Sequence, residues 1–419
     1  MKRRRLLLVA VFALVGGAVA LAALARLSRP EPGPVKTIRG LRVLVLDGTP
    51  REQGFTQGYH LAADIMAGGQ HYISTLPVLR SPALRDSLLK MGSASFLRPP
   101  RYHEEICGIF DGMKARLGED GLHLPALGRK ITVDDLWALN TSPDWHRGLC
   151  SSFSAWGSMT AGGRVLTGRN LDYGGREVID RMALVIVRRS REPGRRAWVG
   201  LGFAGTIGCY SGMNADGLVL LTHDSDSTGR GWPPYYPQAL ALRECIETVT
   251  PGADLARAVA SVLRRHRVFA GSNVHVSSPD SPAAVAEYDG NVKNESGVTL
   301  RRAPPGQDWL ACTNDFLKRQ KRTYDCWRYR ALVKELGERV ASGRRILGLS
   351  DAWRVAGLAG VRDTLHTAVF APERRLIYVA TATPETPAHK CRPVVLSVDE
   401  LLKLTVEPAP EVPAAAPDD

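Results

Sequence analysis

A cysteine at position 150, followed by an arginine and an aspartate, forms a combination that can support nucleophilic catalysis. Cys150 opens a Ser-rich run, and Arg169 and Asp172 lie about twenty residues later. A thiol attacks as the thiolate, and a cysteine with a pKa of about 8.5 stays mostly protonated at neutral pH unless a cation or a base lies beside it. Arg169 and Asp172 would supply such surroundings. The alternative is a buried structural cysteine, because Cys commonly serves as a small core residue.

The segment between these residues is predicted to be a β-hairpin. Apolar and serine side chains alternate after Cys150, the turn at 160–163 ends in two glycines, and residues 164–167 return as a second strand. This hairpin would bring Arg169 and Asp172 back beside Cys150. A thiol, a positive charge and a carboxylate would then meet at one end of a sheet, as nucleophilic attack on an amide requires.

The pattern of the whole chain predicts an α+β fold. Before Cys150 the pattern is mainly helical: glycines recur at four-residue spacing at 54 and 58 and at 108 and 112, which permits close helix packing, and Thr132 with Asp135 resembles a capping box. Candidate strands are 41–46, 183–188, 198–203, 218–222, 274–277, 284–288, 309–313, 367–370 and 376–380, and candidate helices are 236–248, 254–265 and 324–342. Helices grouped between runs of strands indicate antiparallel sheets covered by helices.

The composition is that of a folded globular protein with distinct ends. The 419 residues are 44% hydrophobic and 23% charged. Residues 1–28 have the pattern of a signal peptide or transmembrane anchor, because a basic cluster at 2–5 precedes the uncharged run 6–25. Residues 29–35 are expected to be a linker and 407–419 a disordered tail. We therefore predict export to the periplasm or another extracytoplasmic site, with membrane contact through residues 6–25 if the segment is retained.

Charge and cysteine content argue against several function classes. The formal net charge is +13, but the surplus is mostly scattered arginine, and the export segment argues against nucleic-acid binding. No CxxC pair or HExxH run occurs, so no metal and no cofactor is expected. Seven cysteines leave at least one thiol unpaired in an oxidising compartment, and Cys150 is the candidate.

Four motifs in order, Cys150, 168–172, 212–218 and 313–316, resemble those of the Cys-type N-terminal nucleophile (Ntn) hydrolases. The pattern is similar to that of the self-processing acyltransferases typified by acyl-coenzyme A:6-aminopenicillanic acid acyltransferase, and more distantly to choloylglycine hydrolases and acid ceramidases. The resemblance extends over about residues 41 to 395. It implies a four-layer αββα sandwich of two antiparallel sheets with an N-terminal helical subdomain.

The resemblance also implies that the chain cuts itself between Leu149 and Cys150. Cleavage would divide it into a helical α fragment, 36–149, and an Ntn-hydrolase β fragment, 150–406, which remain associated. The new α-amino group, with an unperturbed pKa of about 7.7 to 8.0, would serve as the base for its own side chain. Leu149 departs from the pattern, because relatives often carry a small or polar residue before the nucleophile.

By the same resemblance, Cys150 is the nucleophile, Arg169 favours the thiolate and orients the substrate, and Asp172 holds the new ammonium. Asn314 matches the asparagine whose side-chain amide points at the oxyanion. The alternatives are a surface ion pair between Arg169 and Asp172, worth about 0 to 1 kcal/mol, and a turn-capping role for Asn314.

Three further positions are assigned to the substrate or oxyanion site. Asp224 stands where choloylglycine relatives have an asparagine, although a backbone N–H could still donate there. His223, next to it, is the histidine expected to line the pocket. Arg328 lies where relatives place a second arginine, and Arg330 competes for that assignment.

The predicted function is that of a self-processing hydrolase or acyltransferase that acts on a linear, non-peptide amide through an acyl-thioester on Cys150. Its partner would be a small-molecule amide or acyl substrate. One alternative is a Cys-His peptidase without self-cleavage, which would need a histidine base such as His60, His146, His223 or His366. Another is a non-catalytic envelope protein that binds an acyl or lipid ligand.

Overall fold

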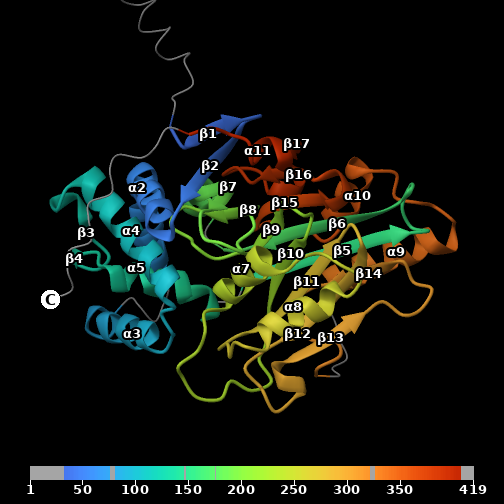
Figure 1. The fold of residues 1–419 in the computed structure, drawn as a ribbon, viewed down its shortest axis with the longest axis horizontal. Helices are drawn as coiled ribbons and strands as arrows, with labels where there is room; N and C mark the ends of the chain where they lie inside the picture. Colours follow the sequence, from blue (N-terminus) through green and yellow to red (C-terminus); the bar gives the residue numbers. More distant parts are fainter. Residues whose placement is uncertain (1–32, 76–80, 146–147, 175, 321–325, 407–419) are drawn as a thin grey trace, which may run out of the picture.

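The computed structural model describes residues 33–75, 81–145, 148–174, 176–320 and 326–406. The predicted signal or anchor segment and the C-terminal tail lie outside these residues, as does most of the predicted linker. Within the described residues, no helix combines the length and the apolar character that a membrane span requires. Two large sheets lie face to face at the centre of the molecule, with helices on both outer sides (Figure 1).

The larger sheet has nine strands in the order β1-β2-β7-β8-β9-β10-β11-β12-β13. Their bounds are β1 Val35–Ile38, β2 Leu41–Gly48, β7 Ala183–Ser190, β8 Trp198–Phe203, β9 Ser211–Asn214, β10 Val219–Ser225, β11 Gly271–Ser278, β12 Ser281–Tyr288 and β13 Val298–Arg302. Neighbouring strands are antiparallel except β2 and β7, which are parallel. The prediction of two purely antiparallel sheets therefore needs this one correction. Only strands joined by a tight hairpin must be antiparallel, and more than 130 residues separate β2 from β7.

The smaller sheet has six strands in the order β14-β5-β6-β15-β16-β17, all antiparallel. Their bounds are β5 Leu149–Gly157, β6 Gly163–Asp172, β14 Trp309–Cys312, β15 Thr364–Ala371, β16 Leu376–Thr381 and β17 Val394–Ser397. A separate pair, β3 His123–Leu124 and β4 Arg129–Lys130, lies among the N-terminal helices. The predicted hairpin around the turn at 160–163 is confirmed as β5 and β6.

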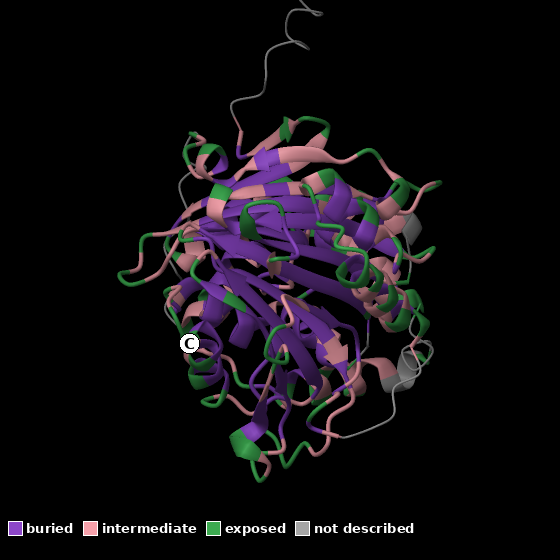
Figure 2. Cartoon of the chain, turned by 90° about the vertical axis from the view of Figure 1, so that its right-hand side faces the viewer, coloured by how far each residue is buried: buried purple, intermediate pink, exposed green. Residues whose placement is uncertain are grey.

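Helices cover the outer faces of both sheets, so the expected four-layer αββα arrangement is confirmed (Figure 1). Their bounds are α2 Pro50–Thr75, α3 Pro82–Ala94, α4 Pro100–Leu117, α5 Val133–Thr141, α6 Arg176–Met182, α7 Gln238–Thr248, α8 Leu255–Leu263, α9 Trp327–Ala341, α10 Leu349–Gly357 and α11 Val398–Leu401. The apolar faces of α2, α4, α7 and α8 pack on the nine-stranded sheet, and those of α9 and α10 pack on the six-stranded sheet. The sheets themselves form the buried centre of the molecule (Figure 2).

Close packing of α2 against α4 confirms the interpretation of the glycine spacing. A Cβ on Gly54 would lie 2.0 Å from the carbonyl oxygen of Glu105, and one on Gly108 would lie 2.3 Å from that of Arg51. Only a residue without a side chain permits the two backbones to approach this closely. The capping box at the start of α5 is also present, because Thr132 and Asp135 exchange side-chain to backbone hydrogen bonds.

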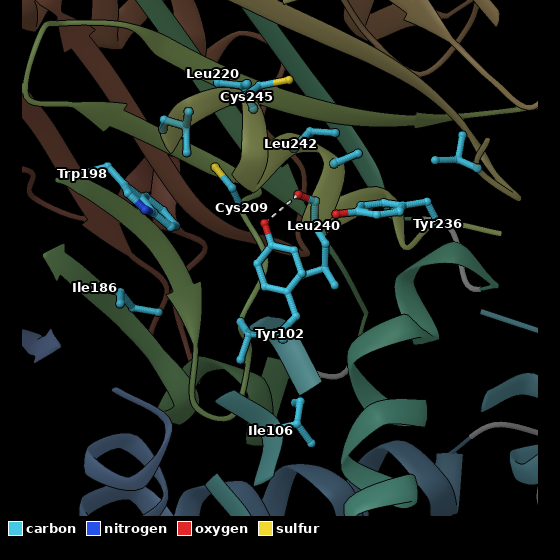
Figure 3. Packing of buried hydrophobic residues seen from close by; sticks show 14 of the residues in the cluster. Tyr102, Ile106, Ile186, Trp198, Cys209, Leu220, Tyr236, Leu240, Leu242 and Cys245 are labelled. Atoms are coloured by element: carbon cyan, nitrogen blue, oxygen red, sulfur yellow. Dashed lines mark hydrogen bonds between the residues drawn. The ribbon is translucent and has the colours of Figure 1, made fainter. Parts of the chain in front are cut away.

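The part of the chain before Cys150 shares one hydrophobic core with the part after it. Tyr102 and Ile106 of α4 pack with Trp198 and with residues of α7, and the Tyr102 hydroxyl donates to the carbonyl of Leu240 (Figure 3). In addition, β1 and β2 form one edge of the nine-stranded sheet, so segment 36–149 contributes strands as well as helices. A cut at position 149 would therefore leave two fragments with a common core.

A group of four buried charges also joins the two parts of the chain. Glu105 of α4 accepts hydrogen bonds from Arg188 of β7 and from Arg243 of α7, each at 2.5 Å. Arg243 also donates to Glu247 at 2.7 Å, and all four side chains are at most 2% exposed. We call these four residues the buried ion cluster. Its two positive and two negative charges pair directly, as buried charges must to offset their desolvation.

Candidate active site

The β5–β6 hairpin positions the predicted nucleophile and its partners. Cys150 lies opposite Leu171, Ser152 lies opposite Arg169, and Leu149 lies opposite Asp172. Asp172 therefore pairs with the residue before the nucleophile. The register places Arg169 and Asp172 at the same sheet end as Cys150.

Two side chains from outside the hairpin hold the backbone of Cys150. The Cys150 N–H donates to Oδ1 of Asn314 at 2.8 Å, and its carbonyl accepts from Nη1 of Arg328 at 2.8 Å. Asn314 follows β14, the neighbour of β5, whereas Arg328 lies in the first turn of α9. The structure thus brings Cys150, Asn314 and Arg328 together over 164 and 178 residues of sequence.

Arg328, rather than Arg330, is the arginine at this site. Its Nη2 donates to Oδ1 of Asn314 at 3.0 Å, and its Nη1 lies 3.3 Å from Oδ2 of Asp172. Helical periodicity explains the choice, because Arg328 lies on the same face of α9 as the buried Leu332 and Leu336. Arg330 is on the exposed face.

Asp172 is a buried carboxylate with a perturbed pKa. Burial raises its pKa to about 6, against the opposing effects of the Thr364 hydroxyl and of the nearby arginines 328 and 169. The Thr364 hydroxyl donates to Oδ1 of Asp172 at 2.7 Å from β15, the strand beside β6. Asp172 would therefore be mostly ionised at neutral pH.

Arg169 is fully buried, and only one of its three guanidinium nitrogens forms a hydrogen bond among the described residues. Its Nη1 donates to the carbonyl of Thr222 on β10 at 2.5 Å, which ties the two sheets together. Among the described residues, its Nε and Nη2 atoms have no hydrogen-bond partner. A buried guanidinium with open donors, lining a cavity, is suited to bind an anion or a developing oxyanion.

The Cys150 thiol is not activated in the uncut chain. Burial raises its pKa to about 11, and the positive charge of Arg169 only partly opposes this effect. The side chain is 4% exposed, and its thiol is not in a disulfide. The charge of Arg169 alone is therefore insufficient, and nucleophilic attack at neutral pH would need a base.

Two other polar side chains of the site, Asn314 and Asp224, form hydrogen bonds with the backbone of Gly148, just before the nucleophile. Nδ2 of Asn314 donates to the carbonyl of Gly148 at 3.2 Å and to that of Asp224 at 2.8 Å. The Asp224 carboxylate, in turn, accepts the N–H of Gly148 at 2.7 Å. Both polar groups of the Gly148 backbone are thus bound by predicted site residues.

A cavity of about 170 Å³ opens beside Cys150. Its apolar walls come from both sides of position 149: α2 and α5 precede it, and α6, β6 and β8 follow it. Its polar lining residues include Arg169, Asp172, Thr222 and Asp224. A mainly apolar cavity with a few convergent polar groups is typical of small-molecule sites.

His223 does not line this cavity, contrary to the expectation from sequence. Side chains alternate along a strand, so Thr222 and Asp224 face the cavity while His223 points to the opposite side. There His223 is fully buried, and Nδ1 lies 3.1 Å from the carbonyl of Asn273. Burial lowers its pKa well below the ordinary value, so it is a neutral structural histidine.

The described residues show no hydrogen bond between Cys150 and a histidine. Nε2 of His366 bonds the Ser211 hydroxyl at 3.1 Å, and His60 is exposed on α2. His146 lies outside the described residues. The Cys-His alternative thus lacks a base in the part of the site that the structure describes.

The run 212–218 has a structural role, and one contact of the site was not predicted from the sequence. In the run 212–218, Asn214 holds the β9–β10 turn: Oδ1 accepts the N–H groups of Asp216 and Leu218, and Nδ2 donates to Ile246. The contact of Thr364 with Asp172 was not predicted from sequence, because a threonine in a strand gives no functional signal. No group of His, Cys, Asp and Glu side chains able to hold a metal was found among the described residues.

Comparison with known proteins identifies similar solved structures. No family model matches the chain, and no curated protein matches it. The Caenorhabditis elegans ortholog of N-acylethanolamine-hydrolyzing acid amidase is 20% identical with a TM-score of 0.40, and the alignment covers 53% of this chain and 93% of that one. A mutant conjugated bile acid hydrolase from Clostridium perfringens is 12% identical with a TM-score of 0.39, over 64% and 99% of the two chains. Penicillin V acylase from Agrobacterium tumefaciens is 16% identical with a TM-score of 0.39, over 62% and 98%.

Proposed function

We propose that this protein is a self-processing amide hydrolase or acyltransferase that works through an acyl-thioester on Cys150. One observation carries the proposal: the backbone of Cys150 is bound by Asn314 and Arg328, beside the buried carboxylate of Asp172, at the edge of a mainly apolar cavity. The strand β14 ends opposite Ser152, so side chains take the place of a neighbouring strand on this side of Cys150. This arrangement suits a residue whose own amide bond is to be broken.

Self-cleavage would proceed by an N-to-S acyl shift. The Cys150 sulfur attacks the carbonyl carbon of Leu149, the C–N bond between the two residues breaks, and the nitrogen takes up the proton lost by the thiol. Water then hydrolyses the thioester, which leaves a carboxylate on Leu149 and restores the thiol. The products are a free amine and a free thiol on Cys150.

Cleavage would turn the groups that hold the precursor into catalytic groups. The Cys150 amine replaces the amide N–H that now donates to Asn314, and it supplies the base that the buried thiol lacks. Release of Gly148 would also free Nδ2 of Asn314, which now donates to its carbonyl. The charge of Asp172, which acts on Cys150, would stabilise the ammonium that forms when the amine takes up the thiol proton.

In turnover, the amine would take the thiol proton and the thiolate would attack the amide carbonyl of the substrate. Asn314 and the open donors of Arg169 would stabilise the oxyanion, an effect worth about 3 kcal/mol for each well-placed donor. The leaving amine would carry away the proton, and water or an acceptor amine would then take the acyl group from sulfur. The shared core and the buried ion cluster support association of the two fragments throughout.

The first 28 residues have the pattern of an export signal or membrane anchor, so we also propose that the enzyme acts outside the cytoplasm. Fractionation of the expressing cells checks this directly. Recovery of the mature protein only from the cytoplasm would contradict it.

The test of the proposed function is the intact mass of purified protein under denaturing conditions. Wild type should give two fragments that meet at Leu149 and Cys150, and Cys150→Ala should remain one chain without activity on amide or thioester probes. Cys312→Ala is the matched control, because Cys312 is a buried thiol on the neighbouring strand, opposite Ser152. This control should be cut and active. An uncut wild type would contradict the self-processing mechanism.

A further inference from the structure

The segment before Cys150 is the first acyl group that the nucleophile would transfer, so its contacts describe the acyl-binding subsite. This inference rests on the proposed function. In self-cleavage, Leu149 becomes the acyl residue of the thioester, and Gly148 is the next residue of that acyl group. Any substrate acyl group must later form a thioester with the same sulfur. The Asp224 carboxylate, which accepts the N–H of Gly148 in the uncut chain, is therefore available to the same part of a substrate, whereas the Asn314 donor is needed at the oxyanion.

Two polar side chains form hydrogen bonds with the backbone of Gly148 in the uncut chain, one as an acceptor and one as a donor. The Asp224 carboxylate accepts its N–H at 2.7 Å, and Nδ2 of Asn314 donates to its carbonyl oxygen at 3.2 Å. The N–H lies five bonds from the scissile carbonyl carbon. A carboxylate cannot donate when ionised, so Asp224 selects a donor at this position.

The subsite disfavours a branch at the Gly148 carbon, because its neighbours would have to shift by a few tenths of an ångström to admit one. A Cβ there would lie 3.2 Å from the backbone oxygen of Asp172, 3.2 Å from the Tyr173 ring and 3.3 Å from the Asp224 carboxylate. These three contacts are tighter than ordinary van der Waals packing. The position therefore suits an unbranched methylene next to the N–H.

We propose that Asp224 is a specificity-determining residue that selects acyl groups with an N–H donor five bonds from the scissile carbonyl, next to an unbranched carbon. The substrate class is thus an amide whose acyl half contains a glycyl-like –NH–CH₂–CO– unit. An asparagine at this position offers both a donor and an acceptor, whereas Asp224 demands a donor from the substrate. This selectivity would explain why the chain has an aspartate at position 224, where choloylglycine relatives have an asparagine.

A matched pair of arylamides tests the proposal. Acetyl-glycyl-leucyl 4-nitroanilide carries the N–H, and 4-oxopentanoyl-leucyl 4-nitroanilide replaces that N–H by CH₂ with the same length and carbonyl groups. The cleaved wild type should show a kcat/KM roughly tenfold to a hundredfold higher for the first probe, the range of a hydrogen bond to a charged group. Acetyl-alanyl-leucyl 4-nitroanilide, which adds a branch at the tight position, should be a poorer substrate than the acetyl-glycyl probe.

Variants locate the preference in one side chain. Asp224→Leu should reduce the ratio of the two kcat/KM values to about one, and Asp224→Asn should give an intermediate ratio. Asp216→Asn is the control: this exposed carboxylate, on the turn that leads into the same strand, pairs with Arg196. It should keep the wild-type ratio.

The outcomes separate this inference from the function on which it rests. Equal wild-type rates for the two probes would overturn the role of Asp224 and leave amide hydrolysis standing, even if the Asp224 variants fail to fold. An unchanged ratio in a folded Asp224→Leu would overturn it as well. Absence of 4-nitroaniline release and of any acyl adduct on Cys150 from all the probes would overturn both.

Discussion

Two groups of buried charges in this protein both combine arginines with carboxylates but differ in how these charges are paired. In the buried ion cluster, Glu105 and Glu247 bind arginines directly at 2.5 to 2.7 Å. At the candidate active site, Asp172 lies 3.3 Å from Arg328, and among the residues that the structure describes Arg169 hydrogen-bonds just one backbone carbonyl, through one of its nitrogens.

The pKa shifts follow this difference. In the cluster, the arginines overcome the burial of Glu247 and hold its pKa below the ordinary value, and the carboxylates raise that of Arg243 in spite of its burial. Arg188 is the exception, because burial lowers its pKa to about 10, yet it stays charged at neutral pH. At the site, burial prevails and raises the pKa of Asp172 to about 6. Paired charges hold a fold together, whereas incompletely paired buried charges are available for chemistry.

The largest expected effect tests the structural half of this comparison. Glu105→Ala leaves Arg188 and Arg243 without their shared partner, so the free energy of unfolding should fall by about 3 to 5 kcal/mol. Denaturant unfolding of the uncut Cys150→Ala protein measures it. Glu104→Ala is the matched control, because Glu104 is half exposed in its ion pair with Arg51, and it should cost about 0 to 1 kcal/mol. Similar losses in the two variants would show that the cluster adds no special stability.

The next effect tests the catalytic half. Asn314→Ala in the cleaved enzyme removes one proposed oxyanion donor, so kcat/KM should fall by about 100-fold, equivalent to about 3 kcal/mol. Steady-state kinetics on an amide probe measures it, with Asn214→Ala as an asparagine control that holds a turn remote from the thiol. Loss of protein stability without loss of kcat/KM in the folded fraction would reduce Asn314 to a structural role.

The smallest effect concerns pH. The pKa of Asp172 is about 6 in the folded chain and about 3.9 in the unfolded chain, so the native state binds the proton more tightly. Its contribution to stability is fully present below pH 3.9 and is lost as the pH rises through 6, for a change of about 2 to 3 kcal/mol. Denaturant unfolding of Cys150→Ala against Cys150→Ala/Asp172→Asn, from pH 4 to 7, measures it. A constant difference between the two proteins over this range would refute the raised pKa.

Local patterns predicted much of the fold but less of the site. The hairpin after Cys150, the capping box at Thr132 and the four-residue spacing of the glycines in α2 all depend on residues near one another in the sequence, where periodicity and turn chemistry act directly. The parallel pairing of β2 with β7 escaped prediction, because no local turn connects the two strands.

Residue types and order by themselves determined the candidate nucleophile, the strands that carry it and the residues that would accompany it. The tertiary structure decided that Arg328 enters the site and that His223 points away from the cavity. It also joined Asp224 to Gly148 across 76 residues and Thr364 to Asp172 across 192. These contacts depend on sheet order and on where α9 and β15 pack, and such long-range pairing is a property of the whole core rather than of any local sequence.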